Sequence, residues 1–287
     1  MHSNGSCLTG HLTVRERRTA AGKVDKAQST QLWFTRLSRR LRDHSAVRET
    51  GTAAGNLSLP AMNNSSPNEF EEGRVLLINK PLEWTSFDAV RKIRNTIRIK
   101  KVGHAGTLDP LATGLLIICT GKFTKKINEY MAKEKEYTGT FTLGAVTPTY
   151  DLESEPTDHK TTDTTTPAQI HEAVKRFLGP ILQVPPAHSA IKVEGKRVYE
   201  LARQGKEVKL EPRAVTIAEF EITHIEMPVV SFRVVCSTGT YIRSLANDFG
   251  KALECGAYLS SLCRTRIGEH KLDQAMSIDE FISQVKK

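Results

Sequence analysis

Apolar and polar positions alternate in two regular ways along the chain from about residue 74 onward. Short apolar or alternating runs are typical of strands, and apolar residues spaced three and four apart are typical of helices. The patterns predict strands at 74–79, 115–119, 135–143, 215–226 and 229–236. They predict helices from 85, over 120–131, from about 170 to 178, over 199–204, from about 242, and over 278–285. Folded structure is therefore expected to begin near Gly73.

The helix predicted after residue 85 has two distinct faces. It opens with Thr-Ser-Phe-Asp at 85–88, a capping pattern, and its apolar residues at 90, 93 and 97 are spaced to face a core. Arg91, Arg94 and Arg98 recur on another face, and two lysines at 100–101 extend the basic stripe. Such a stripe is often only a solvated face. Because this one runs into a glycine-rich loop, we expect it to contact phosphates.

That loop, residues 103–114, has the sequence GHAGTLDPLATG and precedes an apolar strand. Its glycines allow backbone angles that other residues avoid and let another molecule approach the main chain. Asp109 precedes Pro110, which biases the aspartate away from helix and presents its carboxylate from a turn. Spacing alone fits either a turn aspartate or a reactive carboxylate.

Composition becomes informative only when residues 1–67 are counted separately from the rest of the chain. The net charge is +9, of which residues 1–67 carry +6, with ten basic and four acidic side chains. RNA binding must therefore be argued from local patches rather than from net charge. We expect residues 1–67 to be a disordered basic leader, with an organellar transit peptide or a mis-assigned start before Met62 as alternatives.

Five cysteines form no Cys-x-x-Cys pair, and no apolar run is long enough to span a bilayer. We expect a cytoplasmic protein with no membrane association, no disulfide framework and no zinc site.

Several segments together resemble the bacterial tRNA pseudouridine synthase B family, over about residues 74–285. The glycine-rich loop is similar to that family's Gly-x-Leu-Asp-Pro motif, with Thr107 at the variable position. The other matching segments are Lys80-Pro81, Lys135-x-Tyr137, the Tyr-Asp pair at 150–151, the stretch 183–199, Tyr199–Gly205, Gly239-Thr-Tyr-Ile-Arg243 and 256–266. Cys263 departs from the family, where a basic residue is common.

The resemblance implies an α+β pseudouridine synthase fold: a mixed, largely antiparallel sheet flanked by helices, with an insertion that clamps RNA. It also implies the site. Asp109 is the essential residue, Arg243 its ion-pair partner and Tyr137 the group that stacks on the base. The substrate pocket is built by Lys80, Pro81, His104, Tyr241 and Leu262. An equal interpretation of His104 is a loop histidine whose ring nitrogens are hydrogen-bonded within the protein.

The implied reaction is isomerisation of uridine-55 in the TΨC loop of tRNA, the T arm being the partner. It needs no redox step and no phosphate energy, so we expect no metal and no cofactor. The carboxylate could attack the sugar or the base, or remove a sugar proton; the sequence leaves this choice open. The target base must leave its stack.

Two other classes stay open. A non-catalytic RNA-binding or chaperone module would keep the basic stripe and tolerate loss of Asp109. An RNA-guided synthase shares the fold but would need a C-terminal PUA domain, for which no room is expected after residue 287. We expect a stand-alone monomer that needs no guide RNA.

Overall fold

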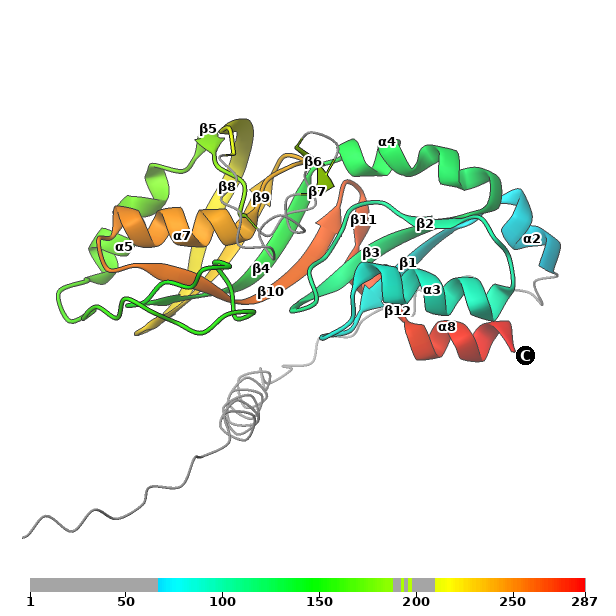
Figure 1. Cartoon of the computed structure of the whole chain (residues 1–287), viewed down its shortest axis with the longest axis horizontal. Helices are drawn as coiled ribbons and strands as arrows, with labels where there is room; N and C mark the ends of the chain where they lie inside the picture. Colours follow the sequence, from blue (N-terminus) through cyan, green and yellow to red (C-terminus); the bar gives the residue numbers. More distant parts are fainter. Residues whose placement is uncertain (1–66, 188–191, 194–195, 198–209, 287) are drawn as a thin grey trace, which may run out of the picture. The chain divides into compact units, whose positions relative to one another are not determined.

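The computed structural model describes residues 67–187, 192–193, 196–197 and 210–286, all within one compact unit, Pro60–Lys287. The expected leader and the helix predicted over 199–204 lie outside the described residues, as does most of the expected RNA-clamping insertion. Within the described part the fold is α+β, as predicted: a mixed sheet carries helices on its flanks (Figure 1).

The described strands build one ten-stranded sheet and a separate short pair, β6 and β7. The main path runs β12-β1-β3-β10-β4-β9-β8-β5, with β2 paired to β3 and β11 to β10. The pairs β1–β12 and β3–β10 are parallel and the other described pairs are antiparallel. The strands are β1 (Val75–Lys80), β2 (Val102–His104), β3 (Ala112–Thr120), β4 (Lys135–Leu143), β5 (Gly179–Gln183), β6 (Lys192–Val193), β7 (Lys196–Arg197), β8 (Arg213–Glu226), β9 (Val229–Cys236), β10 (Ala257–Ile267), β11 (His270–Lys271) and β12 (Met276–Ser277).

The described helices pack in three groups. They are α2 (Pro67–Glu72), α3 (Ser86–Ile97), α4 (Ile127–Ala132), α5 (Pro167–Lys175), α7 (Ile242–Ala252) and α8 (Ile278–Val285), with a 3₁₀ helix at Gly121–Lys126 before α4. Apolar residues of α5 and α7 pack with β4, β8 and β9, where Phe141 stacks on Phe232 at 4.1 Å between ring centroids. Apolar residues of α3 and α8 pack with β1 and β3 in a second cluster. The third group joins α4 and the 3₁₀ helix before it to the central part of β3.

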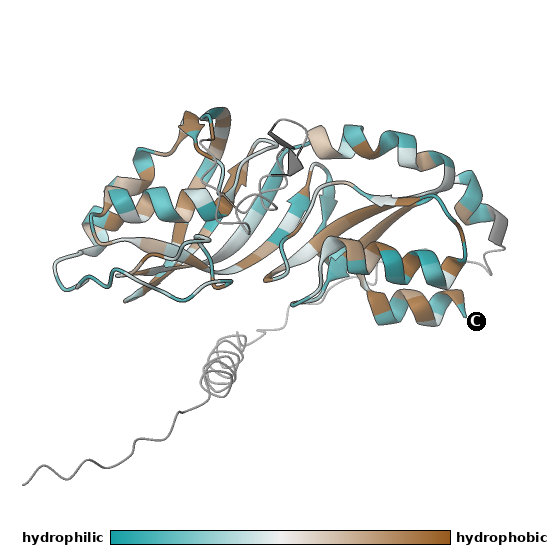
Figure 2. Ribbon diagram, viewed as in Figure 1, coloured by the Kyte–Doolittle hydropathy of each residue, from teal (hydrophilic) through white to brown (hydrophobic). Residues whose placement is uncertain are grey.

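Helix α3 illustrates how the local sequence produces this arrangement. Thr85 and Asp88 form the predicted capping box, in which each side chain bonds the other residue's backbone N–H. Val90, Ile93 and Ile97 are buried, so the apolar face meets the core as predicted. Figure 2 shows the other face of α3 largely in the hydrophilic colour and the nearby strands largely in the hydrophobic colour.

One predicted helix is confirmed, but its C-terminal end is wrong. The helix expected to continue to residue 178 ends at Lys175, and Gly179 begins strand β5 at the sheet edge. Phe177 still packs partly buried against the core, but Leu178 is 44% exposed. Phe177 and Leu178 lie three and four residues after Val174, but they belong to a turn and not to a continuing helix.

Strand β10 contains a bulge that shapes its central part. The pairing with β4 skips from Leu259 to Ser261 while β4 advances by one residue, so Ser260 is the extra residue. A regular strand would put Leu259 and Leu262, three positions apart, on opposite faces. With the bulge, both face the same pocket.

Candidate active site

The Asp109 loop joins β2 to β3 and is fixed by the first turn of α3. The Ser86 hydroxyl donates to the Leu108 carbonyl at 3.0 Å and accepts from the Leu108 N–H at 2.8 Å. The Glu83 N–H donates to the Pro110 carbonyl at 2.9 Å. Hydrogen bonds on both sides of Asp109 thus tie the loop to the start of α3 and to the turn before it.

Arg264 supports the same loop from the sheet. Its guanidinium is fully buried and donates to three carbonyls: Nε to Leu115 at 2.8 Å, Nη1 to Thr107 at 3.4 Å and Nη2 to Gly106 at 3.1 Å. Gly106 has a φ of +104°, a conformation that favours glycine. The planar fork of an arginine suits such a convergent set of acceptors.

Arg243 brings two carboxylates together. Its Nε lies 2.9 Å from Asp109 Oδ2 and its Nη1 lies 3.6 Å from Asp151 Oδ2. The Arg243 and Asp151 side chains are 6% and 5% exposed, whereas Asp109 is 37% exposed. Burial raises the pKa of Asp151, and the attraction of Arg243 opposes that rise. Asp109 is therefore the carboxylate of this network that a substrate can reach.

A small pocket opens beside Asp109 and includes Leu262. It is lined by Asp109, Leu111, Ala112, Asp151, Leu152 and the four consecutive residues 259–262 of the bulged strand. Its volume, about 20 Å³, is room for about one water. A base can enter this pocket only if a side chain of its wall moves.

Lys80 lies against the same loop, at the end of β1. Its ammonium donates to the carbonyls of Pro81 at 2.9 Å, Trp84 at 2.6 Å and Pro110 at 3.4 Å. Burial lowers the pKa of Lys80 to about 8, against the attraction of Asp109, which raises it. Pro81 itself is exposed. The Lys-Pro pair thus joins the turn before α3 to the Asp109 loop.

Tyr137 on β4 pairs in the sheet with Arg264 and hydrogen-bonds its side chain. Tyr137 is buried, and burial raises the pKa of its hydroxyl. His104 ends β2, and burial lowers the pKa of its imidazole. Tyr241 precedes α7, where its backbone N–H donates to Gln183 Oε1 at 2.8 Å and its carbonyl accepts from Gln183 Nε2 at 3.1 Å.

The predicted basic stripe divides into two parts. Arg91 pairs with Asp88 at 2.5 Å in the first half of α3. Arg94 and Arg98 lie toward the other end, away from Ser86 and the loop that Ser86 holds. The stripe runs into the Asp109 loop along the chain, but in space the N-terminal turn of α3 makes the contact.

Sequence reasoning missed two members of this site. Asp151 was noted only as part of a Tyr-Asp pair, and Arg264 only as part of a matching stretch. An arginine in a strand is expected to be exposed, so no local pattern marks Arg264 as buried. Ser86 could have been found, since it directly follows the capping threonine.

Comparison with known proteins gives consistent matches. The family model "TruB family pseudouridylate synthase (N terminal domain)" matches residues 94–242. A tRNA pseudouridine synthase B of Flavobacterium johnsoniae is 56% identical, over 75% of this chain and 97% of that protein. A protein of the same name from Parabacteroides distasonis is 52% identical, over 75% and 96%.

Among solved structures, a chain of a Cbf5-Nop10-Gar1 complex is similar, with a TM-score of 0.60 and 28% identity. The match covers 82% of this chain and 61% of that one, so the present chain spans about three fifths of it. A chain of an H/ACA RNP bound to a substrate RNA has a TM-score of 0.57 and 25% identity, over 82% and 60%.

Proposed function

The chain belongs to the TruB family of pseudouridylate synthases, and from this premise we propose that it converts uridine-55 in the TΨC loop of tRNA to pseudouridine. It is an isomerase, a pseudouridine synthase with the α+β fold of that class. The T arm of tRNA is the part of the substrate that the protein holds.

One observation carries the assignment of the site. Asp109, partly exposed on a fixed loop, is paired with buried Arg243 at 2.9 Å beside a pocket that Leu262 lines. An ion pair with a buried guanidinium orients the carboxylate beside the pocket. An ionised carboxylate that faces a pocket is suited to attack or to accept a proton.

The reaction requires few chemical groups. The bond between N1 and C1′ breaks, the base turns, and C5 bonds to C1′. A proton leaves C5 and N1 ends with a proton, so the product has the same atoms as the substrate. In our proposal Asp109 acts as nucleophile or base, and Arg243 orients its carboxylate through the ion pair.

The other residues hold the base and the loop. We assign Tyr137 to stacking on the uracil, and its hydroxyl to moving the C5 proton. Leu262 forms part of the apolar wall of the pocket. Lys80 and Pro81 hold the turn next to Asp109, while His104 and Tyr241 border the site and contact the flipped nucleotide and its neighbours.

We further propose that the protein acts on bare tRNA as a cytoplasmic monomer, without guide RNA and without cofactor. The relatives that share about half of its sequence are named for tRNA, and the guide-associated chain is more distant, at 28% identity. None of the described helices is long and apolar enough to cross a membrane.

The test is pseudouridine formation in an unmodified tRNA transcript, with no other RNA present. The wild type is expected to modify the T-loop uridine, and Asp109→Asn to bind the transcript without modifying it. Asp163→Asn, at an exposed loop position, is the matched control and keeps full activity. Equal product from Asp109→Asn would remove this carboxylate from the mechanism. Binding without product in all three proteins would favour the RNA-chaperone alternative.

A further inference from the structure

The sequence around the end of α3 is strongly one-sided in charge. Between Asp88 and Asp109 there is no acidic residue, while six basic side chains occupy positions 91, 92, 94, 98, 100 and 101. A helix dipole favours cations in the last turn of a helix. It does not account for an acid-free stretch of twenty residues that continues past the helix.

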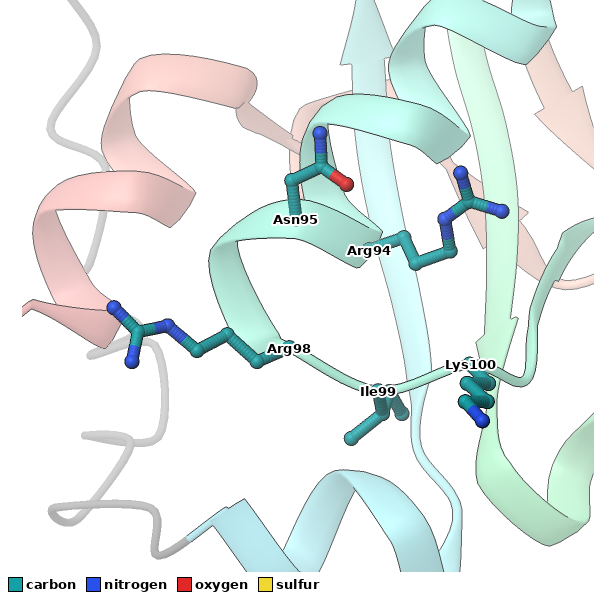
Figure 3. Close-up of a pocket in the computed structure, with 5 residues that line it drawn as sticks. All are labelled: Arg94, Asn95, Arg98, Ile99 and Lys100. Atoms are coloured by element: carbon teal, nitrogen blue, oxygen red, sulfur yellow. The ribbon is translucent and has the colours of Figure 1, made fainter.

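The cations gather around a pocket at the end of α3. Its volume is about 380 Å³, and it is lined by Arg94, Asn95, Arg98, Ile99 and Lys100. In Figure 3 the Arg94 and Arg98 side chains extend to opposite sides of the helix end, and Lys100 lies beyond it. Side chains that diverge in this way do not converge on a single small anion. Divergent cations suit several phosphates along a polymer better than one ion.

These cations are available to a ligand. Among the residues that the structure describes, Arg94, Arg98 and Lys100 form no ion pair with a carboxylate. Arg91 differs, because Asp88 neutralises it. Of the predicted basic stripe, Arg94 and Arg98 therefore remain available to a ligand, and Lys100 joins them in place of Arg91.

The pocket stands at a definite distance from the catalytic loop. Helix α3 has 12 residues, and Ser86 at its start bonds the Asp109 loop. At 1.5 Å per residue, Arg98 lies about 18 Å along the helix from that contact. An A-form RNA duplex rises about 2.8 Å per base pair, so 18 Å corresponds to about six base pairs. RNA that places a uridine at Asp109 thus has room to bring an adjoining stem to the pocket.

We propose that the pocket formed by Arg94, Arg98 and Lys100 binds the phosphate backbone of the RNA duplex that adjoins the target loop. The proposal rests on the proposed tRNA substrate and adds a second contact to it. This contact recognises charge and helical geometry without reading bases. Its function is to hold the stem while the loop deforms and the uridine leaves its stack.

The experiment compares two hairpin RNAs that share a target loop and differ in stem length, one of about ten base pairs and one of three. Dissociation constants of wild type and of Arg94→Gln/Arg98→Gln are measured by anisotropy over a salt series. Each lost phosphate contact costs about fivefold in affinity at 0.15 M salt and lowers the salt slope by about 0.7–0.9. For the long stem we expect about 30-fold weaker binding and a slope lower by about 1.6. For the short stem the two proteins bind alike.

Two matched variants keep the test specific. Lys175→Ala/Lys251→Ala removes the same charge from α5 and α7 and is expected to keep the wild-type slope. Arg94→Lys/Arg98→Lys retains the cations and restores most of the slope, which excludes misfolding as the cause.

Two results would overturn the proposal: an unchanged salt slope in the double Gln variant, or equal losses on long and short stems. The binding measurement does not depend on catalysis. A protein that binds the long stem as expected and makes no pseudouridine would therefore refute the proposed function and leave this contact standing.

Discussion

Replacing Arg264 with methionine removes the side chain that joins the Asp109 loop to the sheet. Methionine keeps much of the volume and none of the donors. The carbonyls of Gly106, Thr107 and Leu115 then lose their partner, and Tyr137 loses a hydrogen bond. We expect the substitution to lower both the free energy of unfolding and the reaction rate, because the Arg264 guanidinium binds a carbonyl of a buried strand and two carbonyls of the Asp109 loop.

The size of the effect follows from which acceptors water can reach. Leu115 is fully buried, so its carbonyl stays unsatisfied, at a cost of about 1–3 kcal/mol. The carbonyls of Gly106 and Thr107 belong to less buried residues and recover part of their bonding from water. We expect a total loss of about 3 kcal/mol in unfolding free energy, or about 6–12 °C in Tm for a domain of this size. A shift of the loop by about 1 Å would lower kcat by about 100-fold.

Arg266→Met is the control, since Arg266 lies on the same strand and pairs with Glu134 at the surface. Exposed pairs of this kind contribute at most about 1 kcal/mol. Thermal unfolding followed by circular dichroism gives Tm, and pseudouridine formation is measured well below both midpoints. If the two variants melt within 2 °C of each other and turn over alike, Arg264 does not hold the loop.

Three further predictions concern the site and its supports. Asp151→Asn weakens a charge-assisted contact worth about 1.5–3 kcal/mol, so the single-turnover rate is expected to fall about 10- to 100-fold at unchanged tRNA affinity; a wild-type rate would contradict this. The pKa of Lys80 is about 8 in the folded protein and 10.5 ordinarily, so the folded state loses the Lys80 proton at a lower pH than the unfolded state does. The contribution of Lys80 to the free energy of unfolding therefore rises from pH 8 to 10.5. Denaturant unfolding at several pH values should show that rise in the wild type and a smaller one in Lys80→Arg, and parallel profiles would exclude it. Gly114→Ala places a Cβ 2.4 Å from the Arg264 carbonyl at a φ of +100°, so a loss above about 3 kcal/mol in unfolding free energy is expected. Gly179→Ala is the control, because Gly179 also has a positive φ but open space around its Cβ position. Equal losses in the two variants would refute the steric argument.

Local patterns predicted the elements whose causes are local. The capping box at Thr85 and Asp88 needs only four adjacent residues, and α3 begins where it predicts. The strand in the apolar run after the Asp109 loop is likewise confirmed as β3, extended at both ends. Strand β5 was missed because Gly179 and Pro180 indicate a helix end, whereas its partner β8 lies more than thirty residues further along the chain.

The site could be predicted only as far as motifs reach. The pattern indicated Asp109, and the family resemblance supplied Arg243, but neither placed Asp151 against the same guanidinium. The bulge at Ser260 breaks the period of two on which strand prediction relies. Arg264 is buried because three distant carbonyls converge on it, and no neighbouring residue carries that information.

The loop that carries Asp109 is held by α3, by the turn after β1 and by β10, so little conformational entropy remains for it to lose when RNA arrives. Adaptation then falls to the leucines of the pocket wall and, above all, to the RNA. Discrimination between transcripts becomes a matter of how cheaply each loop can be distorted, and not only of which bases it contains. RNA loops of different sequence but similar deformability should therefore bind this protein with similar affinity.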